Sequence, residues 1–149
     1  EKDFDRSIII RPHNVYGPDM GYEHIIPEIS KNILSLKNNQ KLKIQGSGNE
    51  TRSFIYIDDF LNAFEKVLRK GKHLEIYNIG TNEEIKIINA IKKILKILGK
   101  KNQISFGKIK KGSPLRRQPK INKIKSFGFN QKIKFNNGLK KTIDWYIKN

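Results

Sequence analysis

The sequence predicts a single α/β domain over residues 1–149, because short apolar segments alternate with segments of helical periodicity. Gly or Asn residues stop most of these segments, as they do at the ends of strands and helices. At 149 residues the chain is long enough to bury a hydrophobic core. The predicted strands are few and short, so they are not expected to form a complete doubly wound sheet.

The first half of the chain contains three predicted strands and two predicted helices. A helix over 24–36 carries isoleucines at helical spacing, and Pro27 falls in its first turn, where a proline removes no hydrogen bond. A second helix over 58–69 begins with Asp58 and Asp59, whose predicted role is to cap free backbone N–H groups. The predicted strands cover residues 7–11, 41–44 and 53–57.

The second half repeats the alternation of strands and helices. Its clearest element is a helix over 87–98, in which Ile and Leu recur every three or four positions and Gly99 stands at the expected C-terminal position. The final helix, over 137–147, is expected to bury an apolar stripe that includes Ile147. Strands are predicted over 74–79 and 103–106, a loop over 107–119 and a short helix over 121–126.

The composition argues against several classes of protein. There is no cysteine, and the three histidines, His13, His24 and His73, lack the spacing of metal ligands. No apolar run reaches the ~18 residues of a membrane span, and no segment has the pattern of a signal peptide. We therefore expect a cytoplasmic protein with no metal site and no membrane contact.

The net charge of +17 has two explanations. Only six of the 31 basic residues are arginines, and lysine is abundant together with isoleucine and asparagine, which is typical of a genome rich in A and T. The alternative is a nucleic-acid-binding surface. We favour it less, because the lysines are spread along the chain and no nucleic-acid-binding motif is present. A positive surface would in either case steer anionic substrates toward the protein.

Residues 11–18, Arg-Pro-His-Asn-Val-Tyr-Gly-Pro, are the most informative stretch. They follow three isoleucines and break into Gly and Pro, which predicts a buried strand that opens into a surface loop. Ligands of open α/β sheets bind at the carboxyl ends of strands, so the polar side chains of this loop are candidates for a site. The alternative is an ordinary turn, and residues 15–18 are predicted to be turn structure.

Three further motifs follow in order along the chain. Residues 46–59 contain a Gly-x-Gly-x-x-x-Arg stretch that ends in Tyr-Ile-Asp-Asp, residues 77–80 are Tyr-Asn-Ile-Gly, and residues 116–119 are Arg-Arg-Gln-Pro. Together with residues 11–18, this ordered set resembles the NAD-dependent epimerase/dehydratase family, the extended short-chain dehydrogenases/reductases. The resemblance covers nearly the whole chain.

The resemblance implies the C-terminal part of a Rossmann-type enzyme: the last core strands plus a small α/β substrate domain. Such enzymes carry NAD, act on nucleotide sugars, often UDP-sugars, and are often homodimers; the resemblance favours a UDP-glucose 4-epimerase or a UDP-glucuronate decarboxylase. The sequence contains neither the Gly-x-x-Gly-x-x-Gly loop for the NAD pyrophosphate nor a Tyr-x-x-x-Lys pair, so this chain alone is not expected to be catalytic. A non-catalytic nucleotide-binding module is the alternative.

The resemblance also implies roles for individual residues. Arg52 and Arg117 would bind the diphosphate, because a guanidinium matches phosphate oxygens in pairs. The alternative for each is a surface ion pair, and Arg116 is a neighbouring candidate. Asn14 would contact the sugar or a phosphate, unless it only caps its own turn. Tyr56 would help to close the phosphate pocket or else belong to the core.

On the cofactor side, Pro12 and His13 fall where the family's chain runs beside the nicotinamide ring. His13 could act as a general base, but we favour a packing or backbone-contact role, so no catalytic residue is predicted in this chain. Residues 20–24 would form an edge over the substrate that shapes sugar specificity. Lys120 stands where many relatives carry Asp, so the nucleotide itself is not predicted.

Overall fold

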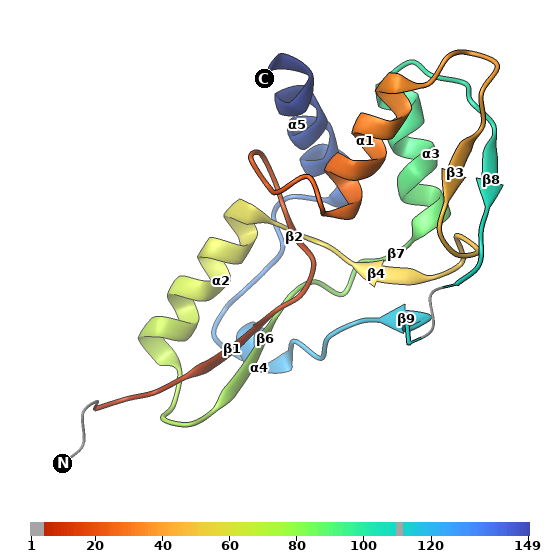
Figure 1. The fold of residues 1–149 in the computed structure, drawn as a ribbon. Helices are drawn as coiled ribbons and strands as arrows, with labels where there is room; N and C mark the ends of the chain where they lie inside the picture. Colours follow the sequence, from red (N-terminus) through yellow and green to blue (C-terminus); the bar gives the residue numbers. More distant parts are fainter. Residues whose placement is uncertain (1–4, 110–111) are drawn as a thin grey trace.

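The computed structural model describes residues 5–109 and 112–149 and confirms the α/β fold class (Figure 1). The helices are α1 (Ile25–Ser35), α2 (Ile57–Lys70), α3 (Ile87–Ile97), α4 (Asn122–Ser126) and α5 (Phe135–Lys148). The strands are β1 (Ile9–Pro12), β2 (Val15–Tyr16), β3 (Leu42–Ile44), β4 (Thr51–Ser53), β5 (Ile55–Tyr56), β6 (Ile76–Ile79), β7 (Glu84–Lys86), β8 (Ile104–Phe106) and β9 (Arg116–Arg117).

The strands pair in small units rather than in one large sheet. β1 pairs with β6, β2 with β5, and β3 with β8, each time in parallel. β4 is the central strand of a three-stranded sheet, antiparallel to β7 and parallel to β9. In Figure 1 this sheet lies between the β1/β6 pair and the β3/β8 pair, so it joins the two ends of the molecule.

Two hydrophobic clusters meet at the β2/β5 pair, because successive side chains of a strand point to opposite faces. In β5, Ile55 belongs to the cluster formed with α2, β6 and α4, whereas Tyr56 belongs to the cluster formed with α1, α3 and α5. Val15 and Tyr16 of β2 divide between the clusters in the same way. Val15 and Tyr16 are therefore strand residues, and the predicted turn over 15–18 is wrong for both.

The apolar stripes of α1, α3 and α5 bury the larger cluster. Ile33 on α1, Ile94 on α3 and Ile143 on α5 are inaccessible to solvent, and α3 packs against both of the other helices. Gly99 follows α3 with a φ of +65°, the left-handed conformation expected of a glycine at that position. Ile147 is 54% exposed, so the expectation that the last helix buries it is wrong.

Besides β2, two further strands lie where the sequence predicts none. β7 follows the predicted strand over 74–79, and β9 lies within the predicted loop over 107–119, of which residues 110 and 111 lie outside the described residues. A strand of two or three residues is too short to show the alternation of apolar and polar side chains. Both strands owe their conformation to pairing with β4, which sequence periodicity does not reveal.

Asp59 does not cap α2, although it lies in the first turn of that helix. The residue preceding α2 makes no side-chain capping bond, and Asp59 is buried at 2% exposure. Its carboxylate accepts hydrogen bonds from the backbone N–H groups of Lys132 (3.1 Å) and Ile133 (2.8 Å). Asp59 therefore ties the start of α2 to the segment that leads into α5.

Replacing Asp59 with Ala is expected to lower the free energy of unfolding by about 2 kcal/mol, because two backbone donors lose a charged acceptor. Asp58→Ala is the matched control, since Asp58 is exposed on the same turn and offers only an interaction with the helix dipole, worth about 0.5 kcal/mol. Urea unfolding of the two variants checks the prediction. Equal losses of stability would show that the bonds to Lys132 and Ile133 contribute little.

Candidate functional site

The two candidate arginines meet on one face of the three-stranded sheet. In the parallel pairing of β4 with β9, Arg52 lies opposite Arg117 and Thr51 lies opposite Arg116. Residues directly opposite one another share a face of the sheet, and their chain neighbours occupy the other face. The register thus places Arg52 beside Arg117 and places Arg116 on the reverse side.

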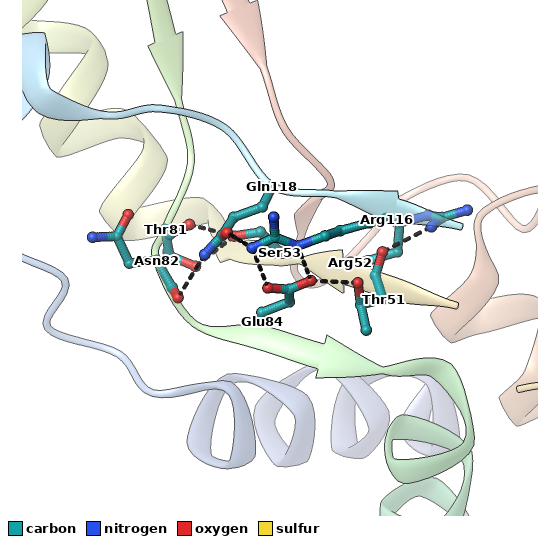
Figure 2. A network of polar contacts seen from close by, with 8 residues as sticks. All are labelled: Thr51, Arg52, Ser53, Thr81, Asn82, Glu84, Arg116 and Gln118. Carbon is teal, nitrogen blue, oxygen red and sulfur yellow. Dashed lines mark hydrogen bonds and ion pairs between the residues drawn. The ribbon is translucent and has the colours of Figure 1, made fainter. Parts of the chain in front are cut away.

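On the reverse face, Arg116 is held by an ion pair within the sheet. Its Nε donates to Oε1 of Glu84 (2.8 Å) and its Nη2 donates to Oε2 (2.9 Å), while Gln118 and Thr51 add further bonds to the same cluster. Figure 2 shows the Arg116 side chain extending toward Glu84 and Gln118, and that of Arg52 extending in the opposite direction. Arg116 is thus a structural residue that fastens β9 to β7.

This network makes Glu84 an unusually strong acid. Hydrogen bonds from Arg116 and then from Thr51 lower the pKa of Glu84 from 4.5 to about 2. Because the folded-state pKa is the lower one, the ion pair contributes its stabilisation fully above about pH 4.5 and loses it as the pH falls toward 2. A carboxyl ¹³C NMR titration is expected to show Glu84 still ionised at pH 3.5, roughly one and a half units above its folded-state midpoint of about 2. A midpoint near 4.5 would contradict the network.

On the other face, Arg52 and Arg117 bring two positive charges together. Arg52 is half-buried, and its Nη1 donates to the backbone carbonyl of Thr51 (2.8 Å). Burial first, and then the charge of Arg117, lower the pKa of the Arg52 guanidinium, while Glu50 opposes the shift. Two guanidinium groups that repel each other in this way are stabilised by a bound anion, and their paired donors suit phosphate oxygens.

Arg52 lines two neighbouring cavities. The larger, of about 280 Å³, lies between α1, the start of α3 and the loop over 45–50. The smaller, of about 230 Å³, extends past Asn14 and Phe54 to the segment that precedes α1. Glu23 and Ile25 line both cavities as well. A ligand centred on Arg52 therefore has room for one group on each side.

Asn14 occupies the corner between β1 and β2. Its φ of +43° is left-handed, a conformation that Asn tolerates better than most residues. Its Nδ2 donates to the carbonyl of Ser53 (2.8 Å), and its own carbonyl accepts from the N–H of Ile55 (3.2 Å). These bonds tie the loop to β4 and β5 rather than to its own turn, and they hold Asn14 on the wall of the smaller cavity beside Arg52.

Pro12 and His13 lie at the carboxyl end of β1. The N–H of His13 continues the ladder to β6 by donating to the carbonyl of Ile79 (2.9 Å). Its Nε2 is buried and has no hydrogen-bond partner among the described residues. Gly80 lies against the same residue, because a Cβ there would come within 3.1 Å of the His13 Cβ and 2.6 Å of Pro119. Neither Pro12 nor His13 lines the two cavities beside Arg52.

Tyr56 lies apart from the arginine pair. It is 5% exposed and packs edge-on against Tyr16, with ring centroids 5.5 Å apart. It lines neither of the cavities that Arg52 lines. Its place in the larger hydrophobic cluster accounts for it as a core residue, which is one of the two roles that the sequence allows.

Sequence reasoning did not single out Glu50, which shapes the loop beside Arg52. Its buried carboxylate accepts from the N–H of Ser47 (2.9 Å), and this bond lowers its pKa. Gly46 has a φ of +88°, and a Cβ there would come within 2.6 Å of the Glu50 carboxylate. The Gly-x-Gly spacing was the available signal, because the first glycine leaves room for this carboxylate.

Among residues 5–109 and 112–149, no helix is long and apolar enough to cross a bilayer. The same residues contain no cluster of three or more acidic or histidine side chains arranged to hold a metal ion.

Comparison with known proteins places this geometry in context. Over residues 2–80 the chain matches the NAD dependent epimerase/dehydratase family. It is 38% identical to human dTDP-D-glucose 4,6-dehydratase over 95% of its own length and 42% of the human protein, and the bovine enzyme is similar at 37%. The chain thus spans less than half the length of these curated relatives.

Solved structures share the fold. The dTDP-glucose 4,6-dehydratase of Bacillus anthracis, solved in complex with NAD, gives a TM-score of 0.84 at 34% identity, over 95% of this chain and 45% of that one. The UDP-glucuronic acid 4-epimerase of Bacillus cereus, solved with UDP-glucuronic acid and NAD, gives 0.85 at 28%, over the same shares. Because the sequence match covers more than half of the chain and the fold agrees, this chain belongs to the NAD dependent epimerase/dehydratase family.

Proposed function

We propose that this chain supplies the nucleotide-sugar-binding part of an NAD-dependent epimerase or dehydratase, as one substrate-binding unit over residues 1–149. The observation that carries the proposal is the in-register pair of Arg52 and Arg117 beside two cavities that share Arg52. A nucleotide sugar has the matching layout, since its diphosphate lies between a nucleoside and a sugar. The relatives named above act on or bind such molecules, which supports the assignment.

The two ends of the ligand can be assigned from the position of β1. The smaller cavity lies beside Asn14, two residues after β1 ends at Pro12. Since the resemblance puts the nicotinamide ring at Pro12 and His13, the reacting sugar belongs in this smaller cavity. The nucleoside then occupies the larger cavity, whose walls include the aliphatic residues Ile29 and Ile91.

The residues present fit one edge of NAD. The buried, unpartnered Nε2 of His13 is a polar atom that another group could satisfy, and it lies at the strand end where the resemblance places the cofactor. When bound, NAD would supply the hydride acceptor for oxidation of the sugar ring. The contribution of this chain is positional: Asn14, Arg52 and Arg117 would hold the sugar in place, and fixed orientation of that kind lowers the barrier to reaction.

Three activities are compatible with this arrangement. UDP-glucose 4-epimerase and UDP-glucuronate decarboxylase follow from the sequence motifs, and the curated relatives add dTDP-glucose 4,6-dehydratase. All of them oxidise a sugar whose diphosphate is bound at a distance from the reacting carbon. We therefore propose that one diphosphate-binding arrangement serves whichever of these reactions the complete enzyme performs.

The test is isothermal titration calorimetry of the chain with UDP-glucose, dTDP-glucose and UMP. Saturable binding of at least one nucleotide sugar is expected, with an affinity that falls as salt is added, because the diphosphate is held by charge. UMP lacks the second phosphate and is expected to bind about tenfold more weakly. Equal affinities for UMP and the nucleotide sugars, or no binding of either sugar nucleotide, would overturn the proposal.

A further inference from the structure

The smaller cavity has few charged side chains on its walls. Its described walls contain one carboxylate, that of Glu23, and one guanidinium, that of Arg52. Asn14 and His24 are its other side chains with nitrogen groups, and the rest are mostly apolar. Lys43 lines the larger cavity and is absent from the walls of the smaller one.

Glu23 stands at the junction of the two cavities. It lies on the segment between β2 and α1 and lines both spaces, as Arg52 does. With the diphosphate on Arg52 and the sugar in the smaller cavity, Glu23 lines the space assigned to the sugar as well as the space assigned to the nucleoside.

The chemistry of this wall suits one class of sugar. The proposed function commits Arg52 to the diphosphate, so a carboxylate on the sugar would find no free lysine or arginine on the described walls of the smaller cavity. It would also face Glu23, and like charges placed together oppose binding. The hydroxyl groups of a neutral sugar, in contrast, can donate hydrogen bonds to a carboxylate.

We infer that the sugar is a neutral hexose and that Glu23 excludes hexuronates from the smaller cavity. This inference rests on the proposed function, and it goes further by naming the class of sugar and the residue that selects it. It favours a glucose-based substrate over a glucuronate-based one. It therefore opposes the decarboxylase activity among the three compatible with the site.

The test compares UDP-glucose with UDP-glucuronate by isothermal titration calorimetry of the chain. The net charge of +17 attracts the more anionic ligand, so general electrostatics predict that UDP-glucuronate binds more tightly. Selection by Glu23 predicts the reverse order, in which UDP-glucuronate binds about tenfold more weakly than UDP-glucose. The difference between the two affinities is expected to become smaller as salt is added, because salt screens the repulsion from Glu23. All titrations are made at the same pH and in the same buffer.

Glu23→Gln keeps the size and hydrogen-bonding capacity of the side chain and removes its charge. It is expected to raise the affinity for UDP-glucuronate by about tenfold and to lower the affinity for UDP-glucose, because the sugar hydroxyls lose a charged acceptor. Glu65→Gln, on the exposed face of α2, removes the same charge far from both cavities and is expected to leave the ratio of affinities unchanged.

The outcomes separate this inference from the function on which it rests. Binding of UDP-glucose together with equal or tighter binding of UDP-glucuronate would overturn the inference and leave the proposed function standing. An unchanged ratio in Glu23→Gln would likewise remove Glu23 as the selecting residue. Failure of every nucleotide sugar to bind would instead contradict the proposed function.

Discussion

Replacing Arg52 with Ala is expected to weaken nucleotide-sugar binding by at least about 100-fold. Arg52 is the one described residue that both lines the two cavities and lies opposite Arg117. Its loss removes charge-assisted hydrogen bonds to the diphosphate worth about 1.5–3 kcal/mol each. The fold should survive, because the hydrogen bond that Arg52 donates within the protein goes to the carbonyl of its own neighbour, Thr51. Calorimetric titration with UDP-glucose measures the loss.

Arg116→Ala is the matched control for this experiment. It removes an arginine from the same pair of strands, but from the face that carries Glu84. Its effect on affinity is expected to stay within about threefold, since the bonds to Glu84 and Gln118 that it removes lie on the face away from Arg52 and Arg117. Arg52→Lys keeps the positive charge but lacks the paired, planar donors of a guanidinium. Its loss of affinity is expected to be about tenfold, between those of the other two variants. A larger loss of affinity in Arg116→Ala than in Arg52→Ala would show that the diphosphate binds on the face of Arg116 and not on that of Arg52.

Gly138→Ala is expected to destabilise the fold by about 3 kcal/mol, although alanine is the better helix former by about 1 kcal/mol. Gly138 is buried on α5, where the helix presses against the tyrosines of β2 and β5. A Cβ at this position would meet the hydroxyl of Tyr16 and lie 2.7 Å from Cδ2 of Tyr56. Both rings are fixed in the core, so the helix would have to move. Thermal and urea unfolding measure the effect.

Two further variants isolate the cause of this destabilisation. Asn137→Ala changes the exposed neighbour on the same helix and is expected to be neutral or slightly stabilising. The Tyr16 hydroxyl also donates a hydrogen bond to the carbonyl of Phe135 (3.2 Å), so Tyr16→Phe is made alone and together with Gly138→Ala. Gly138→Ala should cost less stability in the Tyr16→Phe background than in the wild type, because the hydroxyl that the new methyl group meets is gone. A Gly138→Ala protein as stable as the wild type would show that α5 is not held against Tyr16 as the structure indicates.

The choice between Arg116 and Arg117 shows where sequence reasoning ends. Two adjacent arginines on a two-residue strand have no periodicity that would assign them to faces. The register of β9 against β4 decides the question, because it pairs Arg117 with Arg52. That register joins residues more than 60 positions apart, and such a pairing leaves no trace in the local sequence.

The helices were predictable for the opposite reason. The periodic isoleucines of α1 and α3 mark a buried face within one short window of sequence, and the structure confirms both elements. The role of Asp59 was not predictable, because its partners, Lys132 and Ile133, are distant in the chain. An acidic residue in the first turn of a helix fits a cap equally well, so only the fold distinguishes the two roles.

Some residues of the site could be predicted from the sequence, and others could not. Asn14 and Arg52 were identified from their motifs, and the structure places both on one cavity wall. The segment over 20–24 was expected to form an edge over the substrate, but nothing in its sequence indicated that Glu23 would stand beside Arg52. That position depends on where α1 begins relative to β4, which is a property of the packed core.

A crystal structure of the chain with UDP-glucose would show whether a diphosphate binds between Arg52 and Arg117. We expect phosphate oxygens within about 3 Å of both guanidinium groups, with the sugar beside Asn14 and Glu23. A nucleotide bound on the face of Arg116 and Glu84, or a diphosphate that contacts neither Arg52 nor Arg117, would contradict this expectation.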